Sequence, residues 1–236
     1  MDLINVFDYE KQAQERMNPV YWDFYAGGSD DEVTLQANRT DFARIRLRPR
    51  MLVDVTRCDT GTSVLGLPVQ MPILVAPTAA HCLAHPAGEC ATVQGAGAAG
   101  VLLVASTDAT RSLEEIAQAA SGPLWFQLYI YGSLHIAGRL VQRAEAAGYQ
   151  AIVLTVDLPV MSNRERSKRH GVSLPPPPLV EANLVGIPQE EMGQVPLTWE
   201  TVDWLRSITT LPILLKGILT AEDALLALEH GVAGIV

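Results

Sequence analysis

Polar side chains recur along the chain where short apolar runs end, and such positions hold catalytic groups when the runs are parallel strands. Hydroxyl, amide, carboxylate and ammonium groups are all represented, so the set offers hydrogen bonding, proton transfer and charge stabilisation. These residues are Thr78, Ser106, Gln127, Tyr129, Thr155, Asp157 and Lys216.

Each of these residues also has a simpler interpretation when it is taken alone. Gln127 and Thr155 are suited to satisfying buried backbone groups at strand ends. Tyr129 is suited to packing, and a lone lysine such as Lys216 could instead be the Schiff-base lysine of an aldolase. The shared position at the ends of consecutive strands favours one common site over these separate explanations.

From about residue 71 the sequence alternates between apolar runs and amphipathic segments. This alternation indicates a parallel sheet with helices outside it. Small capping residues, Ser112, Ser133 and Thr220, mark three of the helix starts. The predicted strands cover 72–77, 101–106, 124–130, 151–157, 212–218 and 233–236, and the predicted helices cover 86–99, 112–120, 133–147, 198–208 and 220–230.

A parallel sheet of this kind forms either a doubly wound open sheet or an eight-stranded barrel. No GxGxxG motif follows the first strand, which argues against a dinucleotide-binding open sheet. In a barrel the polar strand ends converge on one mouth. The sequence therefore predicts an α/β protein with an incomplete (β/α)8 TIM barrel, about six of eight strands being present.

The first seventy residues form a different segment. Helices are predicted over 8–17, from Pro19 to 26, and over 29–43, the last opened by a capping box of Ser29 and Glu32. A short hairpin is expected at 62–69. We therefore predict an N-terminal helical segment with a hairpin at 1–70 and a partial TIM barrel at 71–236.

A full barrel takes about 250 residues by itself. The last apolar run, Gly231 to Val236, reads as a sixth strand at the end of the sequence. We therefore expect the chain to be a fragment of a longer protein.

Composition limits the partners. The 236 residues carry a net charge of −9, which disfavours nucleic acid and anionic membranes. Three cysteines without a CxxC motif indicate a reducing compartment rather than a disulfide framework or a zinc site. The polar N-terminus shows no signal peptide, and no apolar run has the length of a membrane span. His81 and His85 are four apart, but the helix is predicted to start only at Pro86, so a metal site there is not expected.

Five stretches resemble the FMN-dependent α-hydroxy acid oxidases and dehydrogenases, a family that includes glycolate oxidase, long-chain hydroxy acid oxidase and lactate oxidase. The resemblance covers essentially the whole chain and implies a TIM barrel that binds FMN and oxidises an α-hydroxy acid. The matching stretches are YWDFYAGGSDDEVTLQAN, PILVAPTA, FQLYIY, LTVDLPVMSNRER and LPILLKGILTAEDA.

The resemblance assigns roles around the flavin. The backbone of the loop after the first strand would lie near the flavin N5, and hydrogen bonds from three further strand ends would hold the ring. Lys216 would place a cation beside N1 and the C2 carbonyl, where it stabilises the charge of reduced flavin. The implied cofactor residues are Pro77, Thr78, Ala79, Ser106, Gln127, Thr155 and Lys216.

The same resemblance assigns substrate and catalytic roles. The Tyr129 hydroxyl would contact the substrate oxygen, and Asp157 would support the catalytic histidine. Arg164 would bind the substrate carboxylate, for which a guanidinium is well shaped, although the basic run 164–169 is also typical of a solvated loop. The long loop from 157 to 196, with prolines at 175–178, is either a surface excursion or a lid.

Two substrate positions depart from the family pattern. Phe24 stands where the family usually has tyrosine, although long-chain hydroxy acid oxidases also have phenylalanine there. Asp108 stands where glycolate oxidase has tryptophan. An acid beside an anionic substrate repels it unless the side chain turns away. The resemblance therefore does not identify a glycolate oxidase.

In the family, the sixth strand leads into a Ser-Asn-His-Gly-Gly-Arg type motif that holds the catalytic base and a second carboxylate ligand. The present sequence has no histidine after His230. The resemblance thus implies that this chain lacks the base, the second arginine and the phosphate site, and we expect little turnover from it alone.

The implied partners are a small α-hydroxy acid and oxygen or another electron acceptor, with a homo-oligomer for the full-length protein. The setting would be cytoplasmic in a bacterium or peroxisomal in a eukaryote. Three alternatives stay open: a type-2 isopentenyl diphosphate isomerase-like FMN enzyme, a Schiff-base aldolase that uses Lys216, and a non-catalytic barrel fragment.

Overall fold

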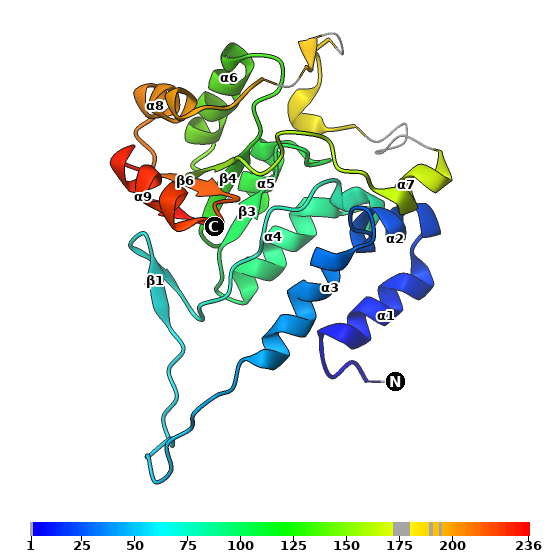
Figure 1. Ribbon diagram of the computed structural model, residues 1–236, viewed down its shortest axis with the longest axis vertical. Helices are drawn as coiled ribbons and strands as arrows, with labels where there is room; N and C mark the ends of the chain where they lie inside the picture. The colour runs from blue at the N-terminus through cyan, green and yellow to red at the C-terminus, as the bar shows by residue number, and fades with distance from the viewer. Residues whose placement is uncertain (1, 172–179, 189–190, 194) are drawn as a thin grey trace. The chain divides into compact units, whose positions relative to one another are not determined.

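The computed structural model describes residues 2–171, 180–188, 191–193 and 195–236 (Figure 1). These residues group into two compact units, one formed by 1–59 with 160–176 and the other by 60–159 with 177–236. The hairpin at 62–69 falls in the second unit, together with the parallel sheet. The domain boundary at residue 70 stays a prediction.

The first unit is helical. The Asn5 side chain accepts hydrogen bonds from the backbone of Phe7 and Asp8 and so begins the first helix, while Pro19 begins the second. His170 contacts Asp23, with Nε2 2.7 Å from Oδ2, and so joins the last helix of the unit to the second. The elements are α1 (Val6–Arg16), α2 (Pro19–Ala26), α3 (Val33–Thr40), the 3-10 turn η1 (Asp41–Arg44) and α7 (Glu165–His170).

Two sequence-based expectations for this unit are wrong. The capping box at Ser29 does not form, because Glu32 itself precedes α3 in a left-handed conformation with φ of 58°. Its carboxylate accepts from the Gly28 backbone at 3.0 Å and pairs with Arg166. The Gly28 hydrogen bond, with help from Arg166, lowers the pKa of Glu32. Most of the basic run is helix α7 rather than a loop, and Arg166 within it pairs with Glu32.

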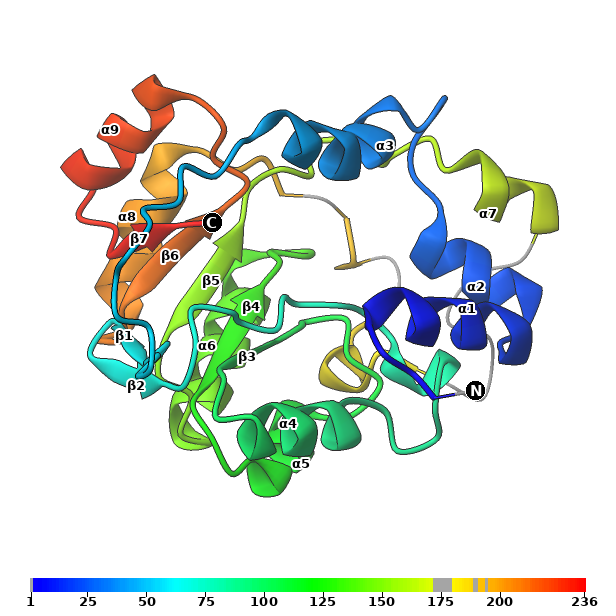
Figure 2. The same cartoon turned by 90° about the horizontal axis from the view of Figure 1, so that it is seen from below.

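The second unit contains a five-stranded parallel sheet whose strands lie side by side in sequence order (Figure 2). Helices separate consecutive strands, as parallel pairing requires. The strands are β3 (Leu103–Ala105), β4 (Leu124–Leu128), β5 (Ile152–Thr155), β6 (Ile213–Lys216) and β7 (Gly234–Ile235). The helices are α4 (Gly88–Ala98), α5 (Leu113–Ala119), α6 (Leu134–Ala146), α8 (Trp199–Ile208) and α9 (Ala221–Glu229), with 3-10 turns η2 (His81–Leu83) and η3 (Ala182–Leu184).

The strand predicted at 72–77 is reduced to one residue. Val75 forms a single parallel bridge with Leu103, and its backbone exchanges hydrogen bonds with Leu102 and Val104 at 2.9 and 3.0 Å. The segment therefore occupies the first strand position beside β3 without a strand's full ladder. The predicted hairpin is present as β1 (Thr62–Val64) and β2 (Leu67–Val69).

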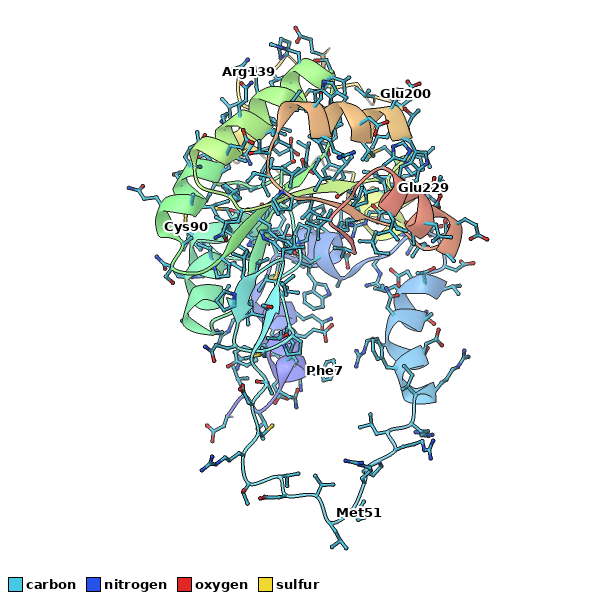
Figure 3. The ribbon with its side chains drawn as sticks, turned by 90° about the vertical axis from the view of Figure 1, so that its left-hand side faces the viewer. Phe7, Met51, Cys90, Arg139, Glu200 and Glu229 are labelled. Atoms are coloured by element: carbon cyan, nitrogen blue, oxygen red, sulfur yellow. The ribbon has the colours of Figure 1, made fainter. Side chains whose placement is uncertain are left out.

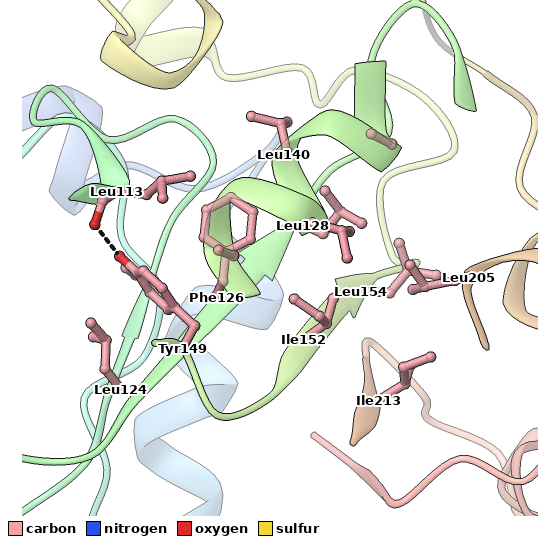
Figure 4. Packing of buried hydrophobic residues seen from close by; sticks show 14 of the residues in the cluster. Leu113, Leu124, Phe126, Leu128, Leu140, Tyr149, Ile152, Leu154, Leu205 and Ile213 are labelled. Carbon is pink, nitrogen blue, oxygen red and sulfur yellow. Dashed lines mark hydrogen bonds between the residues drawn. The ribbon is translucent and has the colours of Figure 1, made fainter. Parts of the chain in front are cut away.

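The two faces of the sheet carry different rows of side chains, because successive residues of a strand point to opposite faces. Phe126, Leu128, Ile152 and Leu154 pack against the helices in the main core (Figure 4). The opposite face holds a smaller core, which the hairpin residues Val64 and Leu67 cover: Val69, Leu102, Val104, Trp125, Ala151, Val153 and Leu214. Gln127, Thr155 and Lys216 each lie two residues after a member of this smaller core, so their side chains point to the same face of the sheet.

Charged side chains lie on the outer surfaces of three helices of the second unit. Arg139 of α6, Glu200 of α8 and Glu229 of α9 are exposed (Figure 3). Within the described part of the chain, no helix combines the length and apolar character that a membrane crossing needs.

We predict that Tyr149→Phe lowers the free energy of unfolding by about 1–3 kcal/mol, because the buried Leu113 carbonyl loses its hydroxyl donor at 2.9 Å. Urea unfolding followed by tryptophan fluorescence measures this. Tyr9→Phe is the control, since Tyr9 is exposed and should change stability by less than about 0.5 kcal/mol. Equal stability of Tyr149→Phe and the wild type would show that the hydroxyl is not needed in the core.

Candidate active site

The side-chain amide of Gln127 organises the carboxyl edge of the sheet. Its Oε1 accepts from Ser106 Oγ at 3.1 Å and from the Thr107 backbone at 3.3 Å. Its Nε2 donates to Thr155 Oγ1 at 3.0 Å. Ser106, Gln127 and Thr155 are all buried, so the structure brings together the three predicted ring-binding residues from three consecutive strands.

Lys216 lies directly beside Thr155, since the two are register partners of β6 and β5. Its Nζ is 3.2 Å from Asp157 Oδ2, and both side chains remain partly exposed. An ion-paired ammonium is a poorer nucleophile than a free amine, which disfavours the aldolase interpretation. The pair instead places a fixed cation at the edge that Gln127 organises.

Gly217 allows this approach. It has φ of +116°, and a Cβ added there would lie 2.4 Å from Asp157 Cβ. The sequence carries this requirement as the Lys-Gly pair, with glycine at a position where any larger residue meets the backbone and side chain of Asp157.

A pocket of about 420 Å³ opens at the same edge. Tyr129, Tyr131 and Thr155 line it together with apolar residues that follow β5 and precede α8. The rings of Tyr129 and Tyr131 lie 5.5 Å apart. Burial raises the pKa of Tyr129 to about 12, with a further contribution from Asp108, so this hydroxyl is a hydrogen-bond donor at neutral pH.

Asp108 turns its carboxylate toward Tyr131. The Tyr131 hydroxyl donates to Oδ2 at 3.1 Å, and Oδ1 is buried without a hydrogen-bond partner among the described residues. Burial, reinforced by Glu181, raises the pKa of Asp108 to about 7, although the Tyr131 hydrogen bond opposes the shift. The acid is thus partly neutral near pH 7, which reduces its repulsion of an anion.

The loop that follows the first strand position lies at the same end of the sheet. Thr78 is exposed and its hydroxyl contacts the Ala76 carbonyl at 3.5 Å, while Pro77 and Ala79 are partly buried. Ala80 donates its backbone N–H to the Asp108 carbonyl at 3.0 Å and so joins this loop to the one after β3. The flavin roles of Pro77, Thr78 and Ala79 stay predictions.

Phe24 and Arg164 belong to the first unit, where the structure places them together. The Arg164 guanidinium donates to the carbonyls of Phe24 and Gly27, the latter at 2.7 Å, and lies 5.3 Å from the centre of the Phe24 ring. Arg164 thus ties the start of α7 to the end of α2, and its role toward a substrate carboxylate stays a prediction.

Sequence reasoning missed two buried residues that support the site. Asn183 donates to the carbonyls of Ser106 and Thr107 at 3.3 and 3.0 Å and accepts from the Leu113 backbone at 2.8 Å. Glu89 accepts hydrogen bonds from two loops at the same edge. Burial of such groups signals a structural or functional role, but the sequence offered no strand-end pattern that would have identified either residue.

Comparison with known proteins identifies the class. The family described as FMN-dependent dehydrogenase matches residues 13–236. Glycolate oxidase of Spinacia oleracea is 44% identical over 250 residues, covering 100% of this chain and 68% of that protein. L-lactate oxidase of Nostoc sp. is 46% identical over 253 residues, covering 99% of this chain and 69% of that protein.

Solved structures of mandelate oxidase are similar to this chain in fold. A mandelate oxidase complexed with 3,3-difluoro-2-hydroxy-3-phenylpropionic acid superposes with a TM-score of 0.91 at 41% identity, covering 99% of this chain and 67% of that one. A mandelate oxidase variant with an FMN adduct gives a TM-score of 0.89 at 42% identity, covering 97% and 66%.

The chain belongs to the FMN-dependent dehydrogenase family. It is a flavoprotein of the glycolate and lactate oxidase type, and its sheet and helices form part of the TIM barrel that the sequence predicted. FMN is the cofactor of this class, and the described residues fit the ring end of it. Hydroxyl and amide groups and one ammonium converge beside the pocket, which matches the alternating acceptors and donors of a flavin ring.

We predict that Gly217→Ala destabilises the protein more than Gly148→Ala does. Both glycines have positive φ, so each alanine costs about 1–2 kcal/mol in backbone strain. Only at Gly217 does the new methyl group also clash with Asp157, whereas nothing lies within 4 Å at Gly148. Urea unfolding of both variants provides the comparison, and an equal loss would contradict the close packing of Asp157 on Gly217.

We predict that Asp108→Asn flattens the pH dependence of stability. The folded-state pKa of about 7 exceeds the ordinary 3.8, so between these values the folded protein keeps a proton that the unfolded chain releases. The free energy of unfolding therefore falls as pH rises from about 4 to about 7, by at most about 1.4 kcal/mol per unit from this group. Asparagine removes that contribution and leaves the smaller one of Glu181, whose pKa burial also raises.

Urea midpoints measured across this pH range test the assignment. An unchanged slope in Asp108→Asn would mean that Asp108 is not the group that titrates there.

Proposed function

We propose that this protein takes part in FMN-dependent oxidation of an α-hydroxy acid to the α-keto acid. The observation that carries the proposal is the array of Ser106, Gln127, Thr155 and Lys216 on one face of the sheet, in a chain of the FMN-dependent dehydrogenase family. Bound FMN supplies an electron-pair acceptor that takes hydride from the substrate carbon.

The flavin-facing residues bind the ring and adjust its electrostatics. Gln127 and Thr155 hold fixed hydrogen-bonding groups in a buried position, so they need no reorganisation when the ring binds. Lys216 contributes a cation where negative charge develops on reduction, and Asp157 fixes its position. Thr78 and the loop around it would border the reacting face.

Tyr129 and Tyr131 are the substrate-facing residues that line the pocket. The Tyr129 hydroxyl, held in its protonated form, would donate to the substrate oxygen. Asp108 would limit the choice of acids, because its charged form repels a second anion nearby. Arg164 would pair with the substrate carboxylate, and Phe24 in place of tyrosine would favour a longer or less polar acid.

We expect these 236 residues to lack the catalytic base, as the family pattern implies. Asp157 is the carboxylate that would support such a base, but the chain has no histidine after His230, which lies at the end of α9. His230 Nδ1 is 2.8 Å from Asp203 Oδ1, and its ring stacks on Trp199. Absence of a positioned base costs about 10²–10⁴ in rate, so we expect this chain alone to turn over little.

The proposed partners follow from this chemistry: a small α-hydroxy acid, and oxygen or another acceptor to reoxidise the flavin. The relatives named above are oxidases from a plant and from Nostoc sp.. A homo-oligomeric full-length protein, in the cytoplasm or the peroxisome according to its source, stays a prediction.

An absorption and fluorescence titration of the 236-residue protein with FMN tests the proposal. We expect saturable binding with quenched flavin fluorescence, and little bleaching of the visible band after addition of lactate or a longer α-hydroxy acid. Failure to bind FMN at any concentration would contradict the proposed site in this chain. Rapid bleaching of the visible flavin band would contradict the expectation that the catalytic base is missing.

We predict that Lys216→Met weakens FMN binding by about tenfold to a hundredfold, because a charge-assisted contact of about 1.5–3 kcal/mol is lost. Lys11→Met is the matched control, since Lys11 is an exposed lysine of α1 in the other unit. Both dissociation constants come from fluorescence quenching. Equal affinities for the two variants would remove Lys216 from the flavin site.

A further inference from the structure

Glu89 is the most deeply buried carboxylate among the described residues that has no part in the proposed chemistry. It is the second residue of α4 and is only 2% exposed. A buried carboxylate is costly unless several donors surround it, so its partners indicate what it stabilises.

The partners of Glu89 come from two separate loops. Oε1 accepts from the backbone of His81 and of Thr110, both at 2.9 Å. Oε2 accepts from Thr110 Oγ1 at 2.9 Å and from the Arg111 backbone at 3.2 Å. Thr110 Oγ1 in turn accepts from the Cys82 backbone at 3.1 Å. One carboxylate and one hydroxyl thus satisfy four backbone N–H groups.

These two loops carry the proposed flavin and substrate residues. The first contains Thr78 and leads directly into His81, while the second contains Asp108. Ala80 directly precedes His81 in the first loop and has φ of 56°. A non-glycine residue keeps this left-handed conformation only under constraint from its surroundings. Its N–H donates to the Asp108 carbonyl at 3.0 Å, so the strained residue lies at the junction of the two loops.

We propose that Glu89 is a positioning residue that fixes the loop carrying Thr78 against the loop carrying Asp108 in the geometry that FMN binding requires. The link between Glu89 and FMN binding rests on the proposed function. A glutamine has one acceptor oxygen where the carboxylate has two, so in Glu89→Gln an NH2 group faces at least one backbone N–H whichever way the amide turns. That mismatch loosens the loops without changing the size of the side chain.

Hydrogen exchange of the full 236-residue chain, read at His81, Cys82, Thr110 and Arg111, is the first measurement. We expect exchange about tenfold faster in Glu89→Gln, since loss of a buried hydrogen bond favours local opening by roughly that factor. Thr110→Val removes only the hydroxyl and should accelerate Cys82 most. Glu222→Gln is the matched control, because Glu222 is the exposed second residue of α9.

FMN affinity is the second measurement, because a purely structural role would leave it unchanged. We expect Glu89→Gln, under conditions where it is folded, to bind FMN about tenfold more weakly than Glu222→Gln. Wild-type exchange at the four amides in Glu89→Gln would overturn the proposal, as would accelerated exchange with unaltered FMN affinity. A wild-type chain that binds no FMN would count against the proposed function, and the exchange result would then decide whether Glu89 holds the loops.

Discussion

Hydrogen bonds of the Gln127 side-chain amide hold together the carboxyl edge of the sheet. The amide is buried, so each of its polar atoms needs a partner, and it finds them to either side: Ser106 and Thr107 directly after β3, and Thr155 on β5. The alternation of side chains along a strand makes this possible, since it directs Gln127 and Lys216 to the face opposite the helices. The register of β5 and β6 then sets Lys216 beside Thr155.

Support for this edge comes from residues that never reach the pocket. Asn183 holds the end of β3 through two carbonyls, and Glu89 joins the loops after the first strand position and after β3. Gly217 leaves room for Asp157 to approach Lys216. Contacts to the backbone thus fix the loops around the site, while side-chain contacts fix Gln127 and Lys216. Such fixed groups are what electrostatic stabilisation of a developing charge requires.

Much of the fold could be predicted because local patterns determine it. Ser112 forms the expected capping box with Glu115, and the apolar runs from 101 onward became strands in the expected order. The errors lie where distant contacts overrule local patterns. Glu32 pairs with Arg166, 134 residues away in sequence, instead of capping α3 within its own turn. Asn183 escaped notice because its partners, Ser106 and Thr107, lie 77 and 76 residues away.

If FMN binds at the carboxyl edge of the sheet as proposed, its ring lies over Gln127, Thr155 and Lys216. NMR of the isotopically labelled 236-residue chain during an FMN titration tests it most directly. We expect the side-chain amide of Gln127 and the backbone amides around Thr155 and Lys216 to shift, while those at the opposite strand ends, Leu124 and Ile213, stay unchanged. Shifts confined to the outer helices, with an unchanged Gln127 amide, would contradict it.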